Sequence, residues 1–236
     1  MRDLYTDGIL EVVRRWDGTL LGPSPENRHV EGVSVFKAEW FERTFATAHP
    51  IMPGVWWGPV IAWCVYTTLV DTRLSAVQVG GGFLLGALAW TLIEYLLHRF
   101  VFHLAPEPSF ESRFKRFMVH GYHHEFPNDR RRLVAPLLLS LPIGAVVAAI
   151  YYFLFGPHAW PIWFAGTVTG YLAYDWIHYY THHFRPRTRL GKFLRRYHME
   201  HHYRDSDSHF GISSPLWDWV FSTAKSRVPR DAAARD

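Results

Sequence analysis

Four long apolar stretches are the feature of this sequence that most restricts its fold. They cover residues 51–70, 77–97, 133–155 and 160–177. Each approaches the ~20 residues that a helix needs to cross ~30 Å of hydrocarbon. Buried core helices of a soluble protein are the alternative, because several stretches contain Gly, Pro or a charge such as Glu94. Since glycine and proline are frequent in membrane helices, the sequence favours four transmembrane spans.

The four stretches pair into two helical hairpins, because only short segments join the members of each pair. DTRLSA connects the first pair and GPHA connects the second. All Lys and Arg residues except Arg73 then fall on one side of the membrane, and so do all histidines except His158. The positive-inside tendency makes this side cytoplasmic. We therefore predict an all-α integral membrane protein whose two hairpins both enter from the cytoplasm.

Composition limits the partners of the chain. Aromatic residues make up 17% of its 236 residues, which suits contact with a membrane interface. The net charge of +4 is modest and no DNA-reading motif is present, so nucleic acid is not expected as a partner. The first residues, MRDLYTDGILEVVRRWDG, lack the apolar core of a signal peptide. The predicted domains are an N-terminal cytosolic or interfacial segment (1–50), a membrane domain (51–223) and a C-terminal tail (224–236).

Histidine is the second informative feature. The chain has 15 histidines and one cysteine, Cys64, so imidazole is the main candidate for a metal ligand. Each hairpin is followed by the same series of motifs: its second span ends in HRFVFH or HYYTHH, and a basic amphipathic stretch then leads to HGYHH or HMEHH. One metal takes four to six ligands, so ten histidines in these four sets argue for two metals.

Helical spacing predicts where the histidines point. Residues three or four apart share a helix face, so each H-x-x-H-H box presents a convergent set of rings. The first box continues an apolar stripe of Phe110, Phe114 and Phe117, and the second continues a stripe of Leu190, Leu194 and Tyr197. His98 and His103 are five residues apart, which is ~140° around an ideal helix. They should therefore bind different metals, or the helix should end between them.

The donor type leaves the metal and the function open. Zinc, copper and iron all accept imidazole. A redox metal beside lipid chains would suit activation of oxygen against an unactivated C–H bond. A metal transporter is the competing class, but transporter sites usually lie near the bilayer midplane, whereas these histidines lie at the membrane surface.

Four runs of the sequence carry a family resemblance: HRFVFH, HGYHHEFPNDRRRLVAP, GYLAYDWIHYYTHH, and YHMEHH with FGISSPLWDWVFST. Together, from about Glu94 to Thr223, they resemble the fatty acid 2-hydroxylase branch of the membrane fatty acid hydroxylase superfamily. The resemblance implies four spans with a cytosolic helical cap that holds a two-metal centre, taken in the family as iron. It also implies O2-dependent hydroxylation at C2 of a fatty acyl chain, free or in a sphingolipid such as ceramide. Carried over by position, the metal ligands are His98, His103, His120, His123, His124, His178, His182, His198, His201 and His202.

Several other residues keep two interpretations. Asp175 and Glu94 precede His178 and His98 on their helices, and each is either a partner of a ligand ring or a charge at a helix end. Arg130, Arg131 and Arg132 either contact lipid phosphates or only set the topology. His183 and His209 lie beside the boxes and are left unassigned, whereas His29, His49 and His158 are interpreted as surface residues.

The resemblance also concerns partners and location. Many relatives carry a fused cytochrome b5 domain, for which residues 1–50 are too few, so we expect a separate cytochrome b5-like or ferredoxin-type electron donor. Zinc could replace iron in purified protein. The expected location is the inner membrane in a bacterium or the endoplasmic reticulum in a eukaryote, with the metals on the cytoplasmic side. A sterol- or carotenoid-type oxygenase, a lipid desaturase and a non-catalytic metal-binding or transport protein remain the alternatives.

Overall fold

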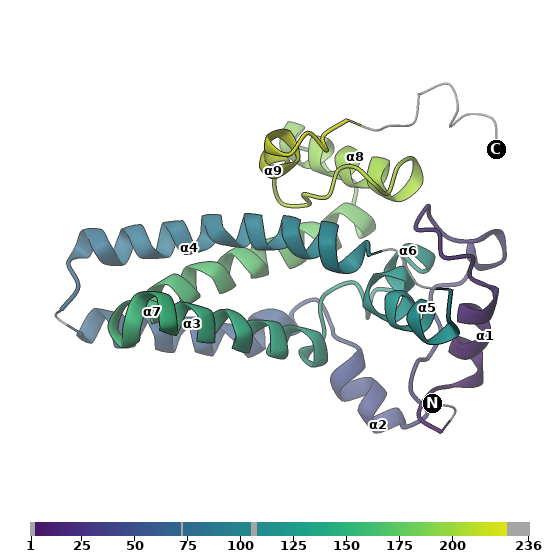
Figure 1. The fold of residues 1–236 in the computed structure, drawn as a ribbon, viewed down its shortest axis with the longest axis horizontal. Coiled ribbons are helices and arrows are strands. Elements are labelled where there is room, and N and C mark those ends of the chain that lie inside the picture. The colour runs from purple at the N-terminus through teal and green to yellow at the C-terminus, as the bar shows by residue number, and fades with distance from the viewer. Residues whose placement is uncertain (1–2, 72, 105–107, 226–236) are drawn as a thin grey trace.

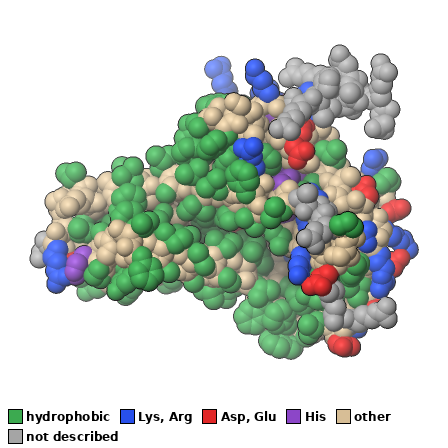
Figure 2. Space-filling view, viewed as in Figure 1, with side chains coloured by type: hydrophobic (Ala, Val, Ile, Leu, Met, Phe, Trp, Pro, Cys, Tyr) green, Lys and Arg blue, Asp and Glu red, His purple; other side chains and the backbone are tan. Residues whose placement is uncertain are grey.

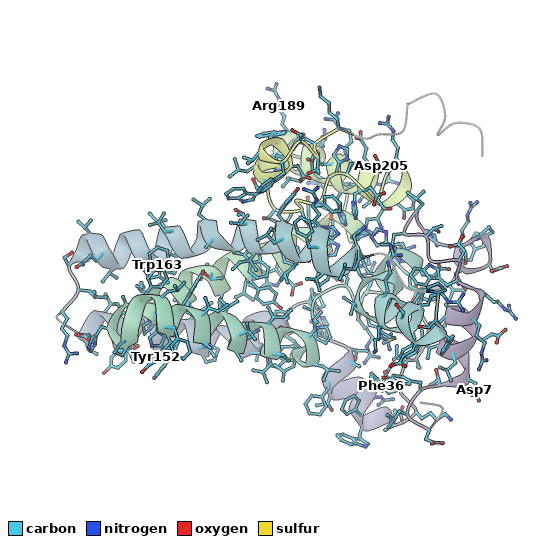
Figure 3. The ribbon with its side chains drawn as sticks, in the orientation of Figure 1. Asp7, Phe36, Tyr152, Trp163, Arg189 and Asp205 are labelled. Carbon is cyan, nitrogen blue, oxygen red and sulfur yellow. The ribbon has the colours of Figure 1, made fainter. Side chains whose placement is uncertain are left out.

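The computed structural model describes residues 3–71, 73–104 and 108–225, and the regular secondary structure of these residues is helical, apart from one isolated β-bridge between Tyr5 and Phe36. Four helical arms form an elongated half of the molecule, and short helices form a cap at the end of the arms opposite the turns of the two hairpins (Figure 1; side chains in Figure 3). The arms are α3 (Met52–Val70), α4 (Ala76–Leu97) and the two halves of α7 (Leu137–His183). The cap contains α1 (Asp7–Arg15), α2 (Glu39–Phe41), α5 (Phe110–Arg116), α6 (Tyr122–Glu125), α8 (Arg189–Tyr203) and α9 (Leu216–Val220).

Helix α7 is a hairpin, because it doubles back at Gly156 (Figure 1). Gly156 has φ 72° and ψ 175°, a conformation that a residue without Cβ adopts at little cost. The first arm begins at Leu137, four residues later than the predicted stretch, because Pro136 disfavours helical geometry in the residue before it. The second arm continues past the predicted end to His183. Two helices, Ala76–Phe102 and Leu137–His183, are long and apolar enough to cross a membrane, with mean hydropathies of 1.6 and 2.2.

Small residues allow α4 and the second arm of α7 to approach closely. A Cβ at Gly86 would lie 2.2 Å from the Trp163 carbonyl oxygen, and one at Gly166 would lie 2.0 Å from that of Phe83. The Thr167 hydroxyl donates to the Gly86 carbonyl at 2.9 Å. Close contact through small residues with an interhelical hydrogen bond is typical of helices that pack in lipid.

The outer surface of the arms is apolar. Hydrophobic side chains cover most of the visible face of the arms, whereas charged side chains gather over the cap (Figure 2). Val77 and Phe153 are each 83% exposed. Such a continuous exposed apolar surface is unfavourable in water and is the surface that lipid chains would cover.

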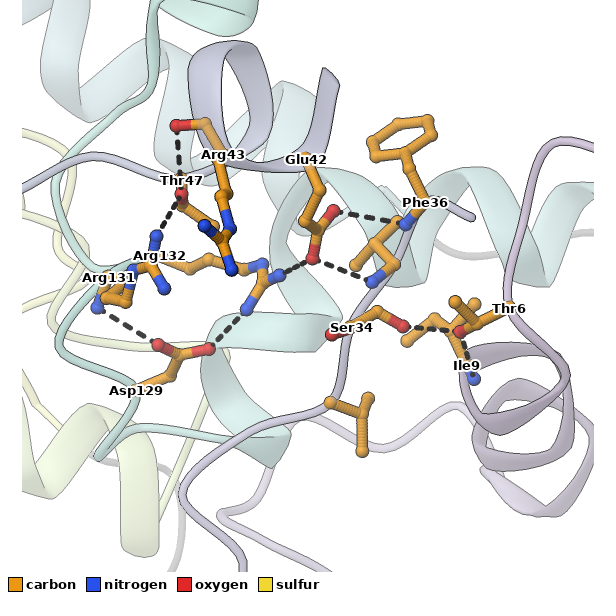
Figure 4. A network of polar contacts seen from close by, with 12 residues as sticks. Thr6, Ile9, Ser34, Phe36, Glu42, Arg43, Thr47, Asp129, Arg131 and Arg132 are labelled. Carbon is orange, nitrogen blue, oxygen red and sulfur yellow. Dashed lines mark hydrogen bonds and ion pairs between the residues drawn. The ribbon is translucent and has the colours of Figure 1, made fainter. Parts of the chain in front are cut away.

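The N-terminal residues belong to the cap. Ile9, Leu10 and Val13 of α1 are buried against Phe114 and Phe117 of the α5 region. A buried ion-pair network joins the next segment, because Arg132 contacts both Glu42 and Asp129, the latter at 2.7 Å (Figure 4). Glu42 also accepts hydrogen bonds from the backbone of residues 35 and 36 at 3.0 Å. These contacts fix residues 5–46 against the helices that carry the first histidine box. Of the predicted C-terminal tail, residues 226–236 lie outside the described part of the chain.

Candidate metal centre

Ten histidines gather into two groups at the cap end of the arms. Within each group, the nearest ring nitrogens all lie within 4.8 Å of one another. Group A consists of His98, His103, His120, His124 and His201, and group B consists of His123, His178, His182, His198 and His202. All ten predicted ligands are in these groups, and His183 and His209 are in neither.

The two H-x-x-H-H boxes exchange one residue each. The first box places His120 and His124 in group A but His123 in group B. The second box places His198 and His202 in group B but His201 in group A. Each group is completed by the pair at the end of one hairpin. The internal repeat of the sequence is therefore an approximate symmetry of the site. The first half of the repeat contributes His123 to group B, and the second half contributes His201 to group A.

Group A depends on two π-helical turns, η3 (His98–Phe102) and η4 (Phe117–Gly121). The wider π turn and the end of the helix at His103 bring His98 and His103 into one group, and the His103 N–H donates to the His98 carbonyl at 3.2 Å. The predicted end of the helix between His98 and His103 is confirmed, because His103 caps the π turn. The alternative prediction, that the two rings belong to different groups, is wrong. Group B instead uses regular helix: His178 and His182 lie one turn apart on α7, and His198 and His202 lie one turn apart on α8.

The second apolar stripe is shorter than predicted. Leu194 and Tyr197 are buried with the histidines of α8, but Leu190 is 67% exposed. Leu190 belongs to the first turn of α8, before the helix packs on the rest of the cap.

The spacing of the ring nitrogens fits one metal ion per group. In group A, the Nε2 atoms of His98 and His124 each lie 3.0 Å from His120 Nε2. In group B, His182 and His198 approach at 2.8 Å, and His123 lies 2.9 Å from His202 and 3.0 Å from His178. Ligands bound at ~2.0–2.1 Å from one ion, at right angles to each other, are separated by about 3 Å.

The chemical state of the rings also fits a metal. Burial lowers the pKa of His120, His198 and His201 well below the usual histidine range, so these rings are neutral and offer a lone pair. His201 Nε2 and both ring nitrogens of His103 are buried without a hydrogen-bond partner among the described residues. A shared ion would satisfy these nitrogens, which would otherwise be costly to bury.

Backbone carbonyls of the 205–214 loop orient two rings of group A. His98 Nδ1 lies 2.6 Å from the Phe210 carbonyl oxygen, and His201 Nδ1 lies 2.7 Å from that of Ser208. If Nδ1 carries the donated proton, the Nε2 lone pair points into the group. Sequence reasoning did not identify these partners, because a carbonyl acceptor leaves no side-chain signal. The nearest signal was the run FGISSPLWDWVF, which contains Phe210.

Two buried carboxylates hold this loop. Asp218 of α9 accepts from the backbone N–H groups of Phe210 at 2.9 Å and Gly211 at 2.7 Å. Glu94 of α4 accepts from those of Ile212 at 2.5 Å and Ser213 at 2.8 Å. Glu94 therefore anchors the loop whose Phe210 carbonyl contacts His98. Its hydrogen bonds to the loop backbone make it more than a charge at a helix end, but they do not involve a histidine ring.

The other assigned and unassigned residues have defined contacts. Asp175 is buried, and its carboxylate accepts from the Ala135 N–H and the Tyr171 hydroxyl, both at 3.1 Å. It therefore braces the start of α7, and these hydrogen bonds do not involve a ligand ring. His209 donates to or accepts from Ser208 Oγ at 2.6 Å and has φ 61°. His29, His49 and His158 are exposed, and His158 contacts Asp71 at the far end of the arms.

An apolar cavity of about 720 Å³ runs between the arms to both groups. Its walls include Trp57 of α3, Trp90 of α4, and Val147 and Phe164 from the two arms of α7. His120 of group A and His123 and His178 of group B are also among the residues that line it. The volume lies in the ~300–1,000 Å³ range of ligand pockets, and the lining suits a long hydrocarbon chain with its end beside the histidines.

Fold and site together define a helical membrane protein with a paired histidine centre at one end of its arms. The family model described as fatty acid hydroxylase matches residues 83–223. The chain belongs to this fatty acid hydroxylase family, whose members are oxidoreductases.

Curated relatives and a solved structure agree with this membership. The chain is 36% identical over 205 residues to dihydroceramide fatty acyl 2-hydroxylase FAH1 of Arabidopsis thaliana, covering 85% of this chain and 84% of that protein. It is 37% identical over 218 residues to fatty acid 2-hydroxylase of Rattus norvegicus, of which it covers 55%. The solved structure of full-length scs7p, in which only the hydroxylase domain is visible, matches with a TM-score of 0.78 at 29% identity, covering 97% of this chain and 83% of that one.

Proposed function

We propose that this protein is a di-iron monooxygenase that hydroxylates C2 of a fatty acyl chain with O2. The observation that carries the proposal is the apolar cavity that reaches both histidine groups. An acyl chain in this cavity would place carbons near its polar end beside the proposed metals. The relatives named as dihydroceramide or fatty acid 2-hydroxylases support position C2 and an acyl substrate, either as a free acid or within a ceramide.

We assign the ten histidines as ligands, five to each ion. Bound iron would supply the activation of O2 that a C–H bond at C2 requires. The protein contributes ring orientation through the carbonyls of Ser208 and Phe210, and it keeps the rings neutral by burial. All-imidazole shells also bind zinc, so zinc would compete in purified protein.

The cavity walls would position the acyl chain and exclude water. The indole rings of Trp57 and Trp90 and the side chains of Val147 and Phe164 leave a path bounded by apolar atoms. The depth to which the chain enters then selects the carbon that meets the histidine groups. A dry cavity also protects reactive oxygen chemistry from side reactions with water.

The proposed topology has four spans, with the cap and both metals on the cytoplasmic side. The four arms, their apolar surface and the confinement of Lys and Arg, apart from Arg73, to one side support it. The membrane would be the inner membrane in a bacterium or the endoplasmic reticulum in a eukaryote. Labelling of single cysteines placed at residue 74 and residue 187 from each side of sealed vesicles would test it, because four spans put these positions on opposite sides.

The proposed electron source is a separate cytochrome b5-like or ferredoxin-type protein. In this structure, the segment before α3 packs its apolar residues into the core of the cap, so it serves the hydroxylase domain itself. Reconstitution with either kind of donor and measurement of product formation would identify the donor.

Lipid mass spectrometry tests the reaction. Cells that produce the chain should accumulate acyl chains with one added oxygen at C2, and a His202→Ala variant should not. A His183→Ala variant is the matched control, because His183 is a neighbouring histidine outside both groups. Loss of two hydrogens would instead identify a desaturase, and oxygen added to a sterol or carotenoid would identify the other oxygenase class. Unchanged lipids with altered metal uptake would contradict every oxygenase assignment.

A further inference from the structure

A second cavity, also of about 720 Å³, lies where the arms meet the cap, and its lining includes none of the ten histidines of groups A and B. Segment 43–50, the beginning of α3, the start of α7 and the loop before α7 all contribute to its lining. Three of the lining residues are arginines, Arg43, Arg130 and Arg131, and the hydroxyl-bearing residues Thr47 and Tyr179 are also among them. No carboxylate is among the described residues that form its wall.

The nearby acids leave most of this positive charge uncompensated. Asp129 uses one carboxylate oxygen for the Arg131 backbone N–H at 3.0 Å and the other for the Arg132 guanidinium at 2.7 Å. The Arg131 guanidinium instead donates to the Thr47 hydroxyl at 3.2 Å. Arg43 is paired with Glu39, but their side chains are 66% and 73% exposed, so solvent screens the pair. Arg43, Thr47 and Arg131 are neighbours in the polar network of Figure 4.

The walls of the cavity change from basic to apolar along the direction of the arms. Met52 and Trp56 belong to the first turns of α3, and Leu137 is the first residue of α7. The positive ends of two long helices therefore face the same region, which adds to its preference for an anion. In the proposed topology, this is the level at which a span leaves the hydrocarbon and enters the lipid headgroups.

We propose that this cavity binds the phosphate of an anionic phospholipid from the cytoplasmic leaflet. The guanidinium groups of Arg130 and Arg131 would pair with the phosphate oxygens, as planar donors suit this anion. The acyl end of the lipid would lie against Trp56 and Leu137. This assignment rests on the proposed topology but not on the proposed hydroxylation.

The bound phosphate would join three parts of the chain. Thr47 lies in the segment before α3, Arg130 and Arg131 lie between the first histidine box and α7, and Tyr179 follows His178 of group B. A ligand that binds only the folded state stabilises it by mass action. Anionic lipid should therefore raise the thermal stability of the cap.

Thermal unfolding of the purified full chain in nanodiscs tests the proposal. Phosphatidylcholine nanodiscs would be compared with nanodiscs that also contain phosphatidylglycerol, and inorganic phosphate would be added in a separate arm. We expect phosphatidylglycerol to raise the midpoint, and Arg130→Gln with Arg131→Gln to increase the half-saturating amount by roughly tenfold. Arg187→Gln with Arg189→Gln is the charge-matched control on exposed arginines outside the cavity and should behave as wild type.

Three results would overturn the proposal. Equal midpoints with and without phosphatidylglycerol would show that no anionic lipid is bound. An equal loss in the Arg187 and Arg189 control would show that general surface charge is responsible. Equal stabilisation by inorganic phosphate through the same arginines would assign the site to a free anion.

Two further measurements separate this proposal from folding defects and from the proposed function. The single variant Arg130→Gln alters only an exposed side chain and should show a partial loss, with the helical content of wild type. Lipid binding through these arginines in a protein that hydroxylates no acyl chain would leave the anion site standing and contradict the hydroxylase assignment. Hydroxylation by a protein that binds no anionic lipid through these arginines would contradict the anion site and leave the hydroxylase assignment standing.

Discussion

The two histidine groups come from equivalent parts of an internal repeat, but different parts of the chain hold their rings. Group A uses two π turns and the carbonyls of Ser208 and Phe210 in an irregular loop. In group B, the four rings of α7 and α8 lie on regular helix, and the Nδ1 atoms of His198 and His202 have no hydrogen-bond partner among the described residues. Group A should therefore be sensitive to changes in the loop, and group B to changes in the packing of α8 on α7.

Substitution of the two exchanged histidines, His123 and His201, gives the largest expected effect. His201→Ala should remove the metal of group A, and His123→Ala that of group B, because each removes one of five rings. We expect one metal equivalent instead of two and a loss of hydroxylation of at least ~100-fold in each variant. Metal analysis with single-turnover product measurement checks this, and His183→Ala should retain two equivalents. Loss of both equivalents from either single variant would mean that the groups form one cooperative site.

Asp218, which anchors the 205–214 loop, should affect the metal affinity of group A but not that of group B. The two carboxylate oxygens of Asp218 accept one backbone N–H each, and Asp218→Asn replaces one of these oxygens with an NH2 group, so the amide can satisfy only one of the two N–H groups. We expect ~1–3 kcal/mol lower unfolding free energy and ~10–100-fold weaker metal binding in group A. Added to His123→Ala, the change should lower the metal content below one equivalent. Added to His201→Ala, it should remove no further metal, and a further loss there would show that group B also depends on the loop.

A change in the contact between α8 and α7 should weaken group B instead of group A, with a smaller effect. Arg195 donates to the carbonyls of Thr181 at 2.8 Å and Phe184 at 2.7 Å, and so holds α8 against the end of α7. Arg195→Gln should weaken metal binding in group B by ~10-fold, because the ring positions loosen while all ligands remain. Competition with a chelator would measure this affinity. Arg196→Gln, which changes an exposed neighbour, is the control; equal weakening in both variants would point to surface charge.

Most of the fold and the gathering of the ten histidines could be predicted because they depend on periodic patterns. Long apolar stretches indicated the four arms, and the repeated boxes indicated ten histidines. The division of those histidines could not be predicted, because His123 and His124 are adjacent in sequence and either could complete either group. Only the three-dimensional arrangement of the helices places His123 in group B and His124 in group A.

The other features that the sequence did not predict also depend on tertiary packing or on backbone atoms. The π turn at His98–Phe102 depends on how the end of α4 packs, so ideal helix spacing misplaced His103. The carbonyls of Ser208 and Phe210 act through the backbone, which carries no residue-specific signal. The sequence indicated a lipid or topology role for Arg132, but Arg132 pairs with Asp129 three residues before it and with Glu42, which reaches it only after residues 5–46 fold onto the cap.

His209 gives the smallest expected effect and the sharpest test of the division into five and five. It lies in the group A loop with φ 61°, a backbone conformation that Asn tolerates and β-branched residues do not. His209→Asn should keep two metal equivalents and cost less than ~1 kcal/mol, whereas His209→Val should destabilise the loop and weaken group A. Thermal unfolding and metal analysis distinguish these outcomes. If His209→Asn alone removed a metal equivalent, the imidazole would be needed in addition to the loop backbone, and the equal division of ten ligands would fail.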